Sequence, residues 1–269
     1  MASPQKPKLR GRPRCVAFTN QKGGVGKSTT TLNVACAAVE LGARVLVRDL
    51  DPQANITSAL DPQGVEYTMN DVLRPDDSGE VVEGCLGSAI RPAGDQWPRG
   101  LYVVPATLAL ADRETDQCVG RELRLRATSS GCIEVFDLVL DDCPPSIGQL
   151  TVNALSADEA VLLVTIATRW GVAGVHQAHR TMRRVVRYYN PTLEFLGVQI
   201  TAYEESRKDP RARHQELTEA YPGMLWEPIP RIEVINKAVG AESPLAAYGS
   251  EAQDARLYYT NIAERLLNG

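Results

Sequence analysis

The chain has 269 residues, 43% of them hydrophobic and 23% charged, which is typical of a soluble globular protein with one large core. Its formal net charge of −4 excludes a protein that attracts polyanions over its whole surface, so any nucleic-acid contact must come from a local basic face. No apolar run approaches the ~20 residues of a membrane span, and the six cysteines show no CxxC spacing, which together predict a cytoplasmic protein with reduced thiols.

The first fourteen residues are polar, basic and rich in proline, and we expect residues 1–14 to form a disordered arm before a single domain over 15–269. The arm is too short for a helix-turn-helix domain. Two interpretations stay open, a solubilising tail and an auxiliary DNA contact.

Apolar runs alternate with helical patterns along the rest of the chain, which predicts an α/β fold with a mostly parallel twisted sheet and helices on both faces. The expected strands cover residues 15–19, 43–49, 101–105, 138–142, 160–165, 195–200 and 227–229. The expected helices cover 27–41, 70–73, 109–125, 148–156, 172–189, 210–221, 232–239 and 251–267. Residues 75–98, rich in Gly, Pro and acids, are expected to form a long surface loop.

A glycine-rich loop separates the first expected strand from the first expected helix. Strand, glycine loop and helix in this order form a cradle for a phosphate chain, because backbone N–H groups and the positive end of the helix point at it. We expect Lys27 to contact the β- and γ-phosphates of a nucleoside triphosphate and the Ser28 hydroxyl to bind Mg²⁺. The expected nucleotide-binding residues here are Gln21, Lys22, Gly23, Gly24, Val25, Gly26, Lys27, Ser28 and Thr29.

Two acidic segments follow later strands. Asp49 and Asp51 come after the second strand, where Asp51 is expected to orient or activate the attacking water beside Mg²⁺ and Asp49 to have a structural role. The apolar strand at 138–142 ends at Asp142, which is expected to hold Mg²⁺. Its neighbour Asp141 would enter a buried sheet face, which is costly unless the carboxylate is paired. Either Asp141 has a partner or that face is open.

The loop departs from the ordinary P-loop pattern, since Gln21 stands in place of a glycine and Lys22 adds a second lysine. In this it resembles the deviant Walker A group, whose members include the ParA/Soj partition ATPases and MinD. The segments DLDPQAN after the second strand and FDLVLDDCPPS at 136–146 resemble the switch regions of that family. The resemblance implies that Lys22 acts in catalysis together with Lys27 and Asp51, by reaching the nucleotide of a partner subunit. It also implies that Pro230 and Arg231 line the base pocket.

Four arginines recur with helical spacing at Arg180, Arg183, Arg184 and Arg187, so they would form one positive stripe suited to phosphate backbones. Val185, Val186 and Tyr189 between them would face inward. The segment resembles a family helix that binds non-specific DNA, although a solvated arginine face remains the alternative. Lys237 lies where chromosomal relatives carry a further DNA-binding motif, and it is expected to add a positive charge there.

The family resemblance implies a slow ATPase with the cofactors ATP and Mg²⁺, in which ATP joins two subunits face to face. The dimer would bind non-specific double-stranded DNA, and a ParB-like partner would stimulate hydrolysis and release the DNA, segregating plasmid or chromosome on the nucleoid. A MinD-like or cargo-positioning ATPase is the alternative, although the C-terminal segment lacks the lysine-rich face of a membrane-binding helix. An iron–sulfur reductase would need cysteines in other segments, and an inactive nucleotide-binding adaptor is disfavoured by Lys27, Asp51 and Asp142. The sequence leaves the cargo open.

Overall fold

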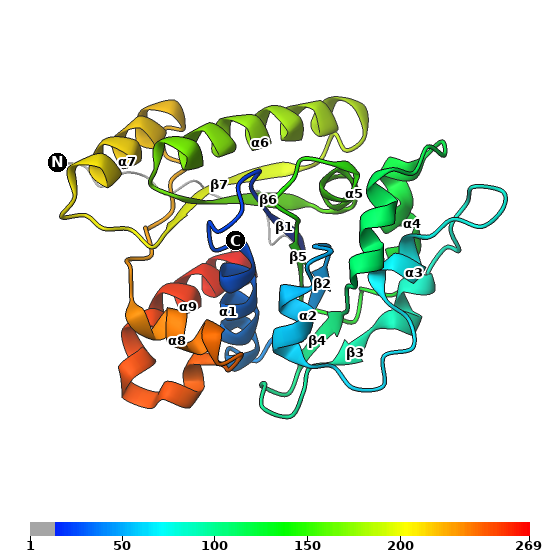
Figure 1. Cartoon of the computed structure of the whole chain (residues 1–269), viewed down its shortest axis with the longest axis horizontal. Coiled ribbons are helices and arrows are strands. Elements are labelled where there is room, and N and C mark those ends of the chain that lie inside the picture. The colour runs from blue at the N-terminus through cyan, green and yellow to red at the C-terminus, as the bar shows by residue number, and fades with distance from the viewer. Residues whose placement is uncertain (1–13) are drawn as a thin grey trace.

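A computed structural model describes residues 14–269 of the chain. Apart from Arg14, the predicted basic arm lies outside these residues. One seven-stranded sheet runs through the described part, in the order β3-β4-β2-β5-β1-β6-β7, and only the pairing of β3 with β4 is antiparallel (Figure 1). The strands are β1 (Cys15–Thr19), β2 (Val45–Asp49), β3 (Arg91–Pro92), β4 (Leu101–Val104), β5 (Leu138–Asp142), β6 (Ala160–Ile166) and β7 (Glu194–Thr201).

Helices cover both faces of the sheet, each with its own apolar core (Figure 1). The helices are α1 (Lys27–Glu40), α2 (Asn55–Leu60), α3 (Met69–Leu73), α4 (Arg124–Ser129), α5 (Gln149–Ala157), α6 (Arg169–Tyr188), α7 (Lys208–Ala220), α8 (Glu233–Gly240) and α9 (Gln253–Asn268). Helices α3 to α6 contribute to the core on one face, and α1, α2, α8 and α9 to the core on the other. Short 3-10 helices complete the chain: η1 (Cys85–Ala89), η2 (Leu108–Glu114), η3 (Arg121–Leu123) and η4 (Leu245–Ala252).

The central strands are buried along their whole length because helices cover them on both faces, as is usual for a parallel sheet. Every residue of β1 and β5 is buried. Since parallel strands end at the same edge, the loops after β1, β2 and β5 meet there. β1 lies between β5 and β6, so the chain leaves it at the point where strand order reverses, the usual place for a ligand in such sheets.

Three sequence predictions of secondary structure are wrong. The expected helix at 109–125 is broken into η2, η3 and α4, because Gly120 takes a left-handed conformation with φ of 77°. The expected strand at 227–229 does not form: isolated bridges flank it at Leu225 and Pro230, since Pro228 and Pro230 lack the N–H that a ladder requires. The expected surface loop at 75–98 contains η1 and the edge strand β3.

The question left open for Asp141 is answered by a buried ion network. Arg48 Nε lies 2.5 Å from Asp141 Oδ1 and Arg48 Nη2 lies 3.0 Å from Asp141 Oδ2, a bidentate pair between neighbouring strands. The same guanidinium contacts Asp158 Oδ1 at 2.5 Å and donates to Ser129 Oγ at 2.9 Å. All three charged side chains are at most 1% exposed. Asp141 therefore has a partner, and the face it enters is closed.

Candidate nucleotide-binding site

The glycine-rich loop is held in shape by its neighbours. Gly26 has φ of 82°, which favours glycine, and a Cβ there would lie 3.2 Å from Thr201 Oγ1 at the end of β7. That hydroxyl donates to Val25 O at 2.8 Å. At the start of the loop, Asn20 Nδ2 donates to Val164 O at 2.7 Å, and its Oδ1 accepts from Lys22 N. The backbone is therefore fixed from both sides, as an anion-binding loop requires.

Lys27 begins α1 and is 6% exposed, with its Nζ 3.5 Å from Lys22 O. Its ammonium thus lies within the loop and not in solvent. Lys22 is half-buried, and it does not line the cavity that Lys27 lines. The two lysines therefore have different surroundings.

Asp51 is positioned by Asp49, the last residue of β2. Asp49 Oδ1 accepts from Asp51 N at 3.1 Å, while its Oδ2 accepts from Thr57 N and Thr57 Oγ1 at 2.9 and 2.7 Å. Asp49 is fully buried, and burial raises its pKa to about 6 despite these hydrogen bonds. The predicted structural role fits this geometry, because Asp49 connects the Asp51 turn to α2, a helix that the sequence prediction missed.

Asp142 ends β5 at full burial, and its pKa is raised to about 8, first by burial and then by the charge of Asp49, against a hydrogen bond from Ser28. Its Oδ2 has no hydrogen-bond partner among the described residues. A buried, unpartnered carboxylate oxygen beside a hydroxyl fits Mg²⁺, which prefers oxygen ligands. Within residues 14–269, no three His, Cys, Asp or Glu side chains gather as a metal site, which suits an ion that keeps water and phosphate ligands.

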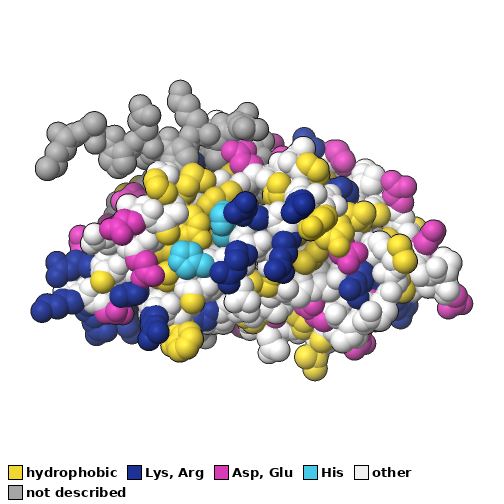
Figure 2. All heavy atoms as spheres, turned by 90° about the horizontal axis from the view of Figure 1, so that it is seen from above, with side chains coloured by type: hydrophobic (Ala, Val, Ile, Leu, Met, Phe, Trp, Pro, Cys, Tyr) yellow, Lys and Arg dark blue, Asp and Glu magenta, His cyan; other side chains and the backbone are white. Residues whose placement is uncertain are grey.

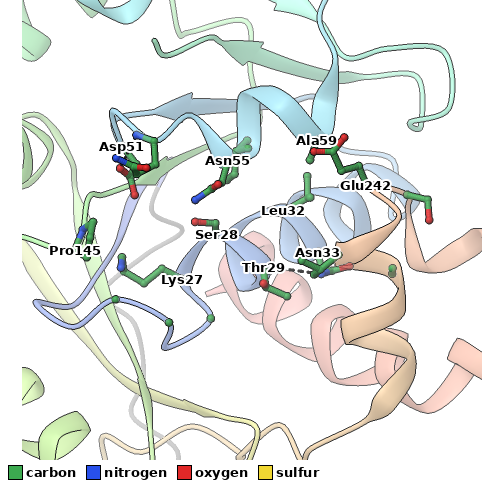
Figure 3. Close-up of a pocket in the computed structure, with 18 of the residues that line it drawn as sticks. Lys27, Ser28, Thr29, Leu32, Asn33, Asp51, Asn55, Ala59, Pro145 and Glu242 are labelled. Atoms are coloured by element: carbon green, nitrogen blue, oxygen red, sulfur yellow. Dashed lines mark hydrogen bonds between the residues drawn. The ribbon is translucent and has the colours of Figure 1, made fainter. Parts of the chain in front are cut away.

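Lys27, Ser28 and Asp51 line a cavity of about 500 Å³ at the carboxyl edge of the sheet. Figure 3 shows Lys27, Asp51 and Pro145 grouped at one end, with Ser28 facing Asn55 across the cavity. The other end is lined by apolar side chains of α1 and α2, by Trp97 and by the end of α8 near Glu242. The charged end can hold phosphate oxygens, a metal ion and an attacking water together.

A second cavity, of about 330 Å³, opens from the other side of the loop. It shares Gly24, Gly26 and Thr29 with the first cavity, and Pro230 and Arg231 are among its lining residues. Ile229, Ile232 and Ile235 add apolar surface. The base of a nucleotide bound in this cavity would be joined to a phosphate chain that runs over the glycine-rich loop toward Lys27.

Comparison with known proteins identifies the family. A family model described as an AAA domain matches residues 13–195. The chain is 33% identical to the chromosome-partitioning ATPase Soj of Thermus thermophilus, over 96% of this chain and 97% of that one. It is 30% identical to the sporulation initiation inhibitor protein Soj of Bacillus subtilis, over 95% and 99%.

The chain belongs to the ParA/Soj family of partition ATPases. It is also 30% identical to a solved structure from Mycobacterium smegmatis, named as cobyrinic acid a,c-diamide synthase with a bound ATP analogue and magnesium, with a TM-score of 0.74 over 94% of each chain. The cofactors expected from the sequence, ATP and Mg²⁺, thus correspond to what that relative binds.

The predicted arginine stripe of this ParA/Soj-type ATPase lies on the outer face of α6. Arg180, Arg183, Arg184 and Arg187 are all exposed, and among the described residues none of them forms an ion pair. Figure 2, which looks down on α6 and α7, shows Lys and Arg side chains gathered over this region next to two histidines. The four charges are therefore available to a phosphate backbone.

One prediction around this stripe needs correction, and Lys237 lies apart from it. Val185 is buried and Val186 partly buried, as expected, but Tyr189 follows the end of α6 and is 37% exposed, because the helix stops at Tyr188. Lys237 lies on α8, across the sheet from α6, and its Nζ pairs with Glu251 Oε1 at 2.6 Å. Within one subunit its charge is thus already matched by a carboxylate and does not extend the stripe.

Several residues that shape the site are not predicted by the sequence motifs. Thr57 and Thr201 fix the two loops through hydroxyl hydrogen bonds, and neither belongs to a recognisable motif. Arg48 could have been found, because a lone arginine in the apolar run VLVRD must meet a buried carboxylate. Over residues 14–269, no helix combines the length and apolar character that crossing a bilayer requires.

Proposed function

We propose that this chain is an ATP-dependent, dimerising partition ATPase that binds non-specific DNA in its ATP state and releases it after hydrolysis. The observation that carries the proposal is the gathering of Lys27, Ser28 and Asp51 on one cavity beside a paired-lysine loop, with the buried Asp142 carboxylate, whose Oδ2 has no partner among the described residues, next to Ser28. Each of these groups matches a need of phosphoryl transfer, and the family relationship supports the same activity.

The proposed roles follow from position. Lys27 binds the β- and γ-phosphates, while backbone N–H groups of residues 23–29 surround them. Ser28, Asp51 and Asp142 hold Mg²⁺, which neutralises the charge that develops on the phosphate oxygens. Asp51, fixed by Asp49, orients the attacking water and accepts its proton. Pro230 and Arg231 contact the base.

Dimerisation follows from the place of Lys22. Its residue is half-buried, and no ion pair holds its side chain among the described residues. We propose that it crosses to the nucleotide of a second copy, so that the triphosphate joins two subunits. Hydrolysis then removes the group that both lysines contact, and slow turnover suits such a switch.

DNA binding is assigned to the exposed arginines of α6. A stripe without base-reading groups suits phosphate contacts that do not depend on sequence. A ParB-like protein is proposed as the partner that accelerates hydrolysis and so frees the DNA on the nucleoid in the cytoplasm. The alternative of a membrane-cycling ATPase loses support from α9, because Tyr259, Ile262 and Leu266 are buried within the domain.

A gel-shift experiment on random-sequence duplex DNA tests the proposal. It compares four states of the protein: without nucleotide, with ADP, with ATP and with a slowly hydrolysed ATP analogue, all with Mg²⁺. Retention only with ATP and the analogue, whatever the DNA sequence, supports the proposal. Retention that ignores the nucleotide, or none at all, contradicts it. Lys27→Ala serves as the matched control, since it leaves the arginine stripe intact.

A further inference from the structure

The loop that follows Asp142 is held by a side chain from a distant part of the chain. This loop, residues 143–148, connects β5 to α5 and carries Pro145 at the charged end of the cavity. Pro145 also lies against the glycine-rich loop, where a Cβ on Gly23 would be 3.6 Å from Pro145 Cβ. The position of this loop therefore shapes the space around the terminal phosphate.

Helix α5 begins without a cap of its own. Its N-cap residue is Gly148, which has no side chain to accept a hydrogen bond, and its first turn contains no acidic residue. Glu114, from the 3-10 helix η2, supplies the missing carboxylate: its Oε2 accepts from Gln149 N at 2.5 Å. Its Oε1 accepts from Ser146 Oγ at 3.3 Å. One side chain thus holds both the loop and the positive end of the helix.

Gly148 is needed at this place for space. Its φ of −90° and ψ of −162° are open to other residues, so backbone conformation does not require glycine. A Cβ there would lie 2.2 Å from Glu114 Oε2 and 2.7 Å from its Cδ, well inside contact distance. The absent side chain is what allows the carboxylate to sit on the helix end.

Further hydrogen bonds continue the attachment along α5. Asn153 Oδ1 accepts from Leu125 N at 3.1 Å, and Asn153 Nδ2 donates to Arg121 O at 2.8 Å. Arg126 Nη2 donates to Ser156 O near the end of the helix. The segment from η2 to α4 therefore holds α5 along its length, and Glu114 is the contact at the end nearest the phosphate site.

We propose that Glu114 is a positioning residue for ATP hydrolysis, which acts by holding the 143–148 loop and Pro145 in place at the terminal phosphate. The inference rests on the proposed ATPase function. Glu114 touches neither the nucleotide cavity nor its lysines, so it acts on turnover through the loop while nucleotide binding depends on residues elsewhere.

Steady-state ATP hydrolysis separates these two effects. Glu114→Ala is expected to lower kcat at least tenfold while KM changes less than threefold, and Glu114→Gln, which keeps an acceptor for Gln149 N, loses less. Gly148→Ala is expected to cause the same fall by displacing the carboxylate, and the double variant no further fall, because both changes break one contact. Asp112→Asn is the matched control on η2, since Asp112 is exposed and should leave kcat unchanged.

Hydrogen exchange of the peptide covering residues 143–152 tests the contact without turnover. Exchange at the start of α5 is expected to quicken in Glu114→Ala and Gly148→Ala and to stay at the wild-type rate in Asp112→Asn. If Glu114→Ala keeps the wild-type kcat and the wild-type exchange rate, the inference is overturned while the proposed function stands. The same holds if the losses of kcat add in the double variant. A wild-type protein that cannot hydrolyse ATP would overturn the proposed function, and the inference with it.

Discussion

Replacing Arg48 with methionine should destabilise the protein by an amount that depends on pH. The guanidinium is the only cation in contact with Asp141 and Asp158 among the described residues, and both carboxyls are fully buried. One guanidinium cannot neutralise two buried carboxylates, so one of the two carboxyls keeps a proton. Burial and the charge of Asp141 raise the pKa of Asp158 well above its usual value, so Asp158 carries that proton.

The size of the destabilisation in Arg48→Met follows from proton linkage. Without Arg48, Asp141 must also be buried neutral, although it would ionise in the unfolded chain with a pKa of about 3.9. Keeping it protonated at pH 7 costs about 4 kcal/mol, and at pH 5 about 1.5 kcal/mol. The first figure agrees with the ~3–5 kcal/mol typical of breaking a buried ion pair.

The stability of the wild type and of Arg48→Met depends on pH in the same direction. A carboxyl whose pKa is raised by folding binds a proton in the native state that the unfolded state lacks, so stability falls as pH rises above the unfolded pKa. Burial raises the pKa of both carboxyls in the wild type, that of Asp158 well above its usual value, while the charge of Arg48 opposes the shift of Asp141. Losing Arg48 removes that opposition, so Arg48→Met adds Asp141 as a second full contributor. The free energy of unfolding should therefore fall by up to about 1.4 kcal/mol per pH unit from this source in the wild type and up to about 2.7 in the variant.

Urea denaturation at pH 5, 6 and 7 measures these differences. Arg44→Met is the control, because the Arg44 side chain is exposed and its guanidinium lies over the rings of Tyr102 and Phe136, so its effect should be small and independent of pH. A loss for Arg48→Met that is the same at pH 5 and pH 7, or below about 1 kcal/mol at pH 7, would refute the reasoning on the buried network.

Three further predictions concern the site. Lys27→Ala should abolish ATP binding in calorimetry because it removes the charge opposite the phosphates, and retained affinity would contradict its role. Asp51→Ala should still bind ATP but accumulate as a dimer, since the attacking water is no longer oriented; unchanged turnover would refute this role. Removing Arg183 and Arg187 together should weaken DNA binding and lower its salt slope by about 2 while sparing ATP binding. Lys237→Ala, whose charge is already paired, is the control, and an unaltered slope in the arginine variant would move the DNA site elsewhere.

The sequence predicted the strands and helices around the site well because that part of the fold depends on local signals. The apolar runs of β1 and β5 match the structure at both ends, and the glycine loop leads into α1 as expected. The breaks at Gly120 and Pro228 were visible in the sequence, yet their effect depends on neighbours that periodicity does not show.

What could not be predicted are contacts between segments far apart in the chain. Glu114 reaches Gln149, and Arg48 reaches Asp158, through the order in which strands and helices pack. The pairing of Lys237 with a residue of η4 likewise depends on how the chain turns after α8. Motifs identified the residues of the site, while the tertiary fold determined which of them are free to act.

Sedimentation of the protein with ATP and Mg²⁺ tests the central claim most directly, since that claim is a dimer joined through the nucleotide. The account predicts a dimer for Asp51→Ala with ATP and monomers with ADP. It also predicts that adding Lys22→Ala to that variant returns it to monomers without loss of ATP binding. A protein saturated with ATP that stays monomeric in every form, or a dimer that survives the loss of Lys22, would contradict the account.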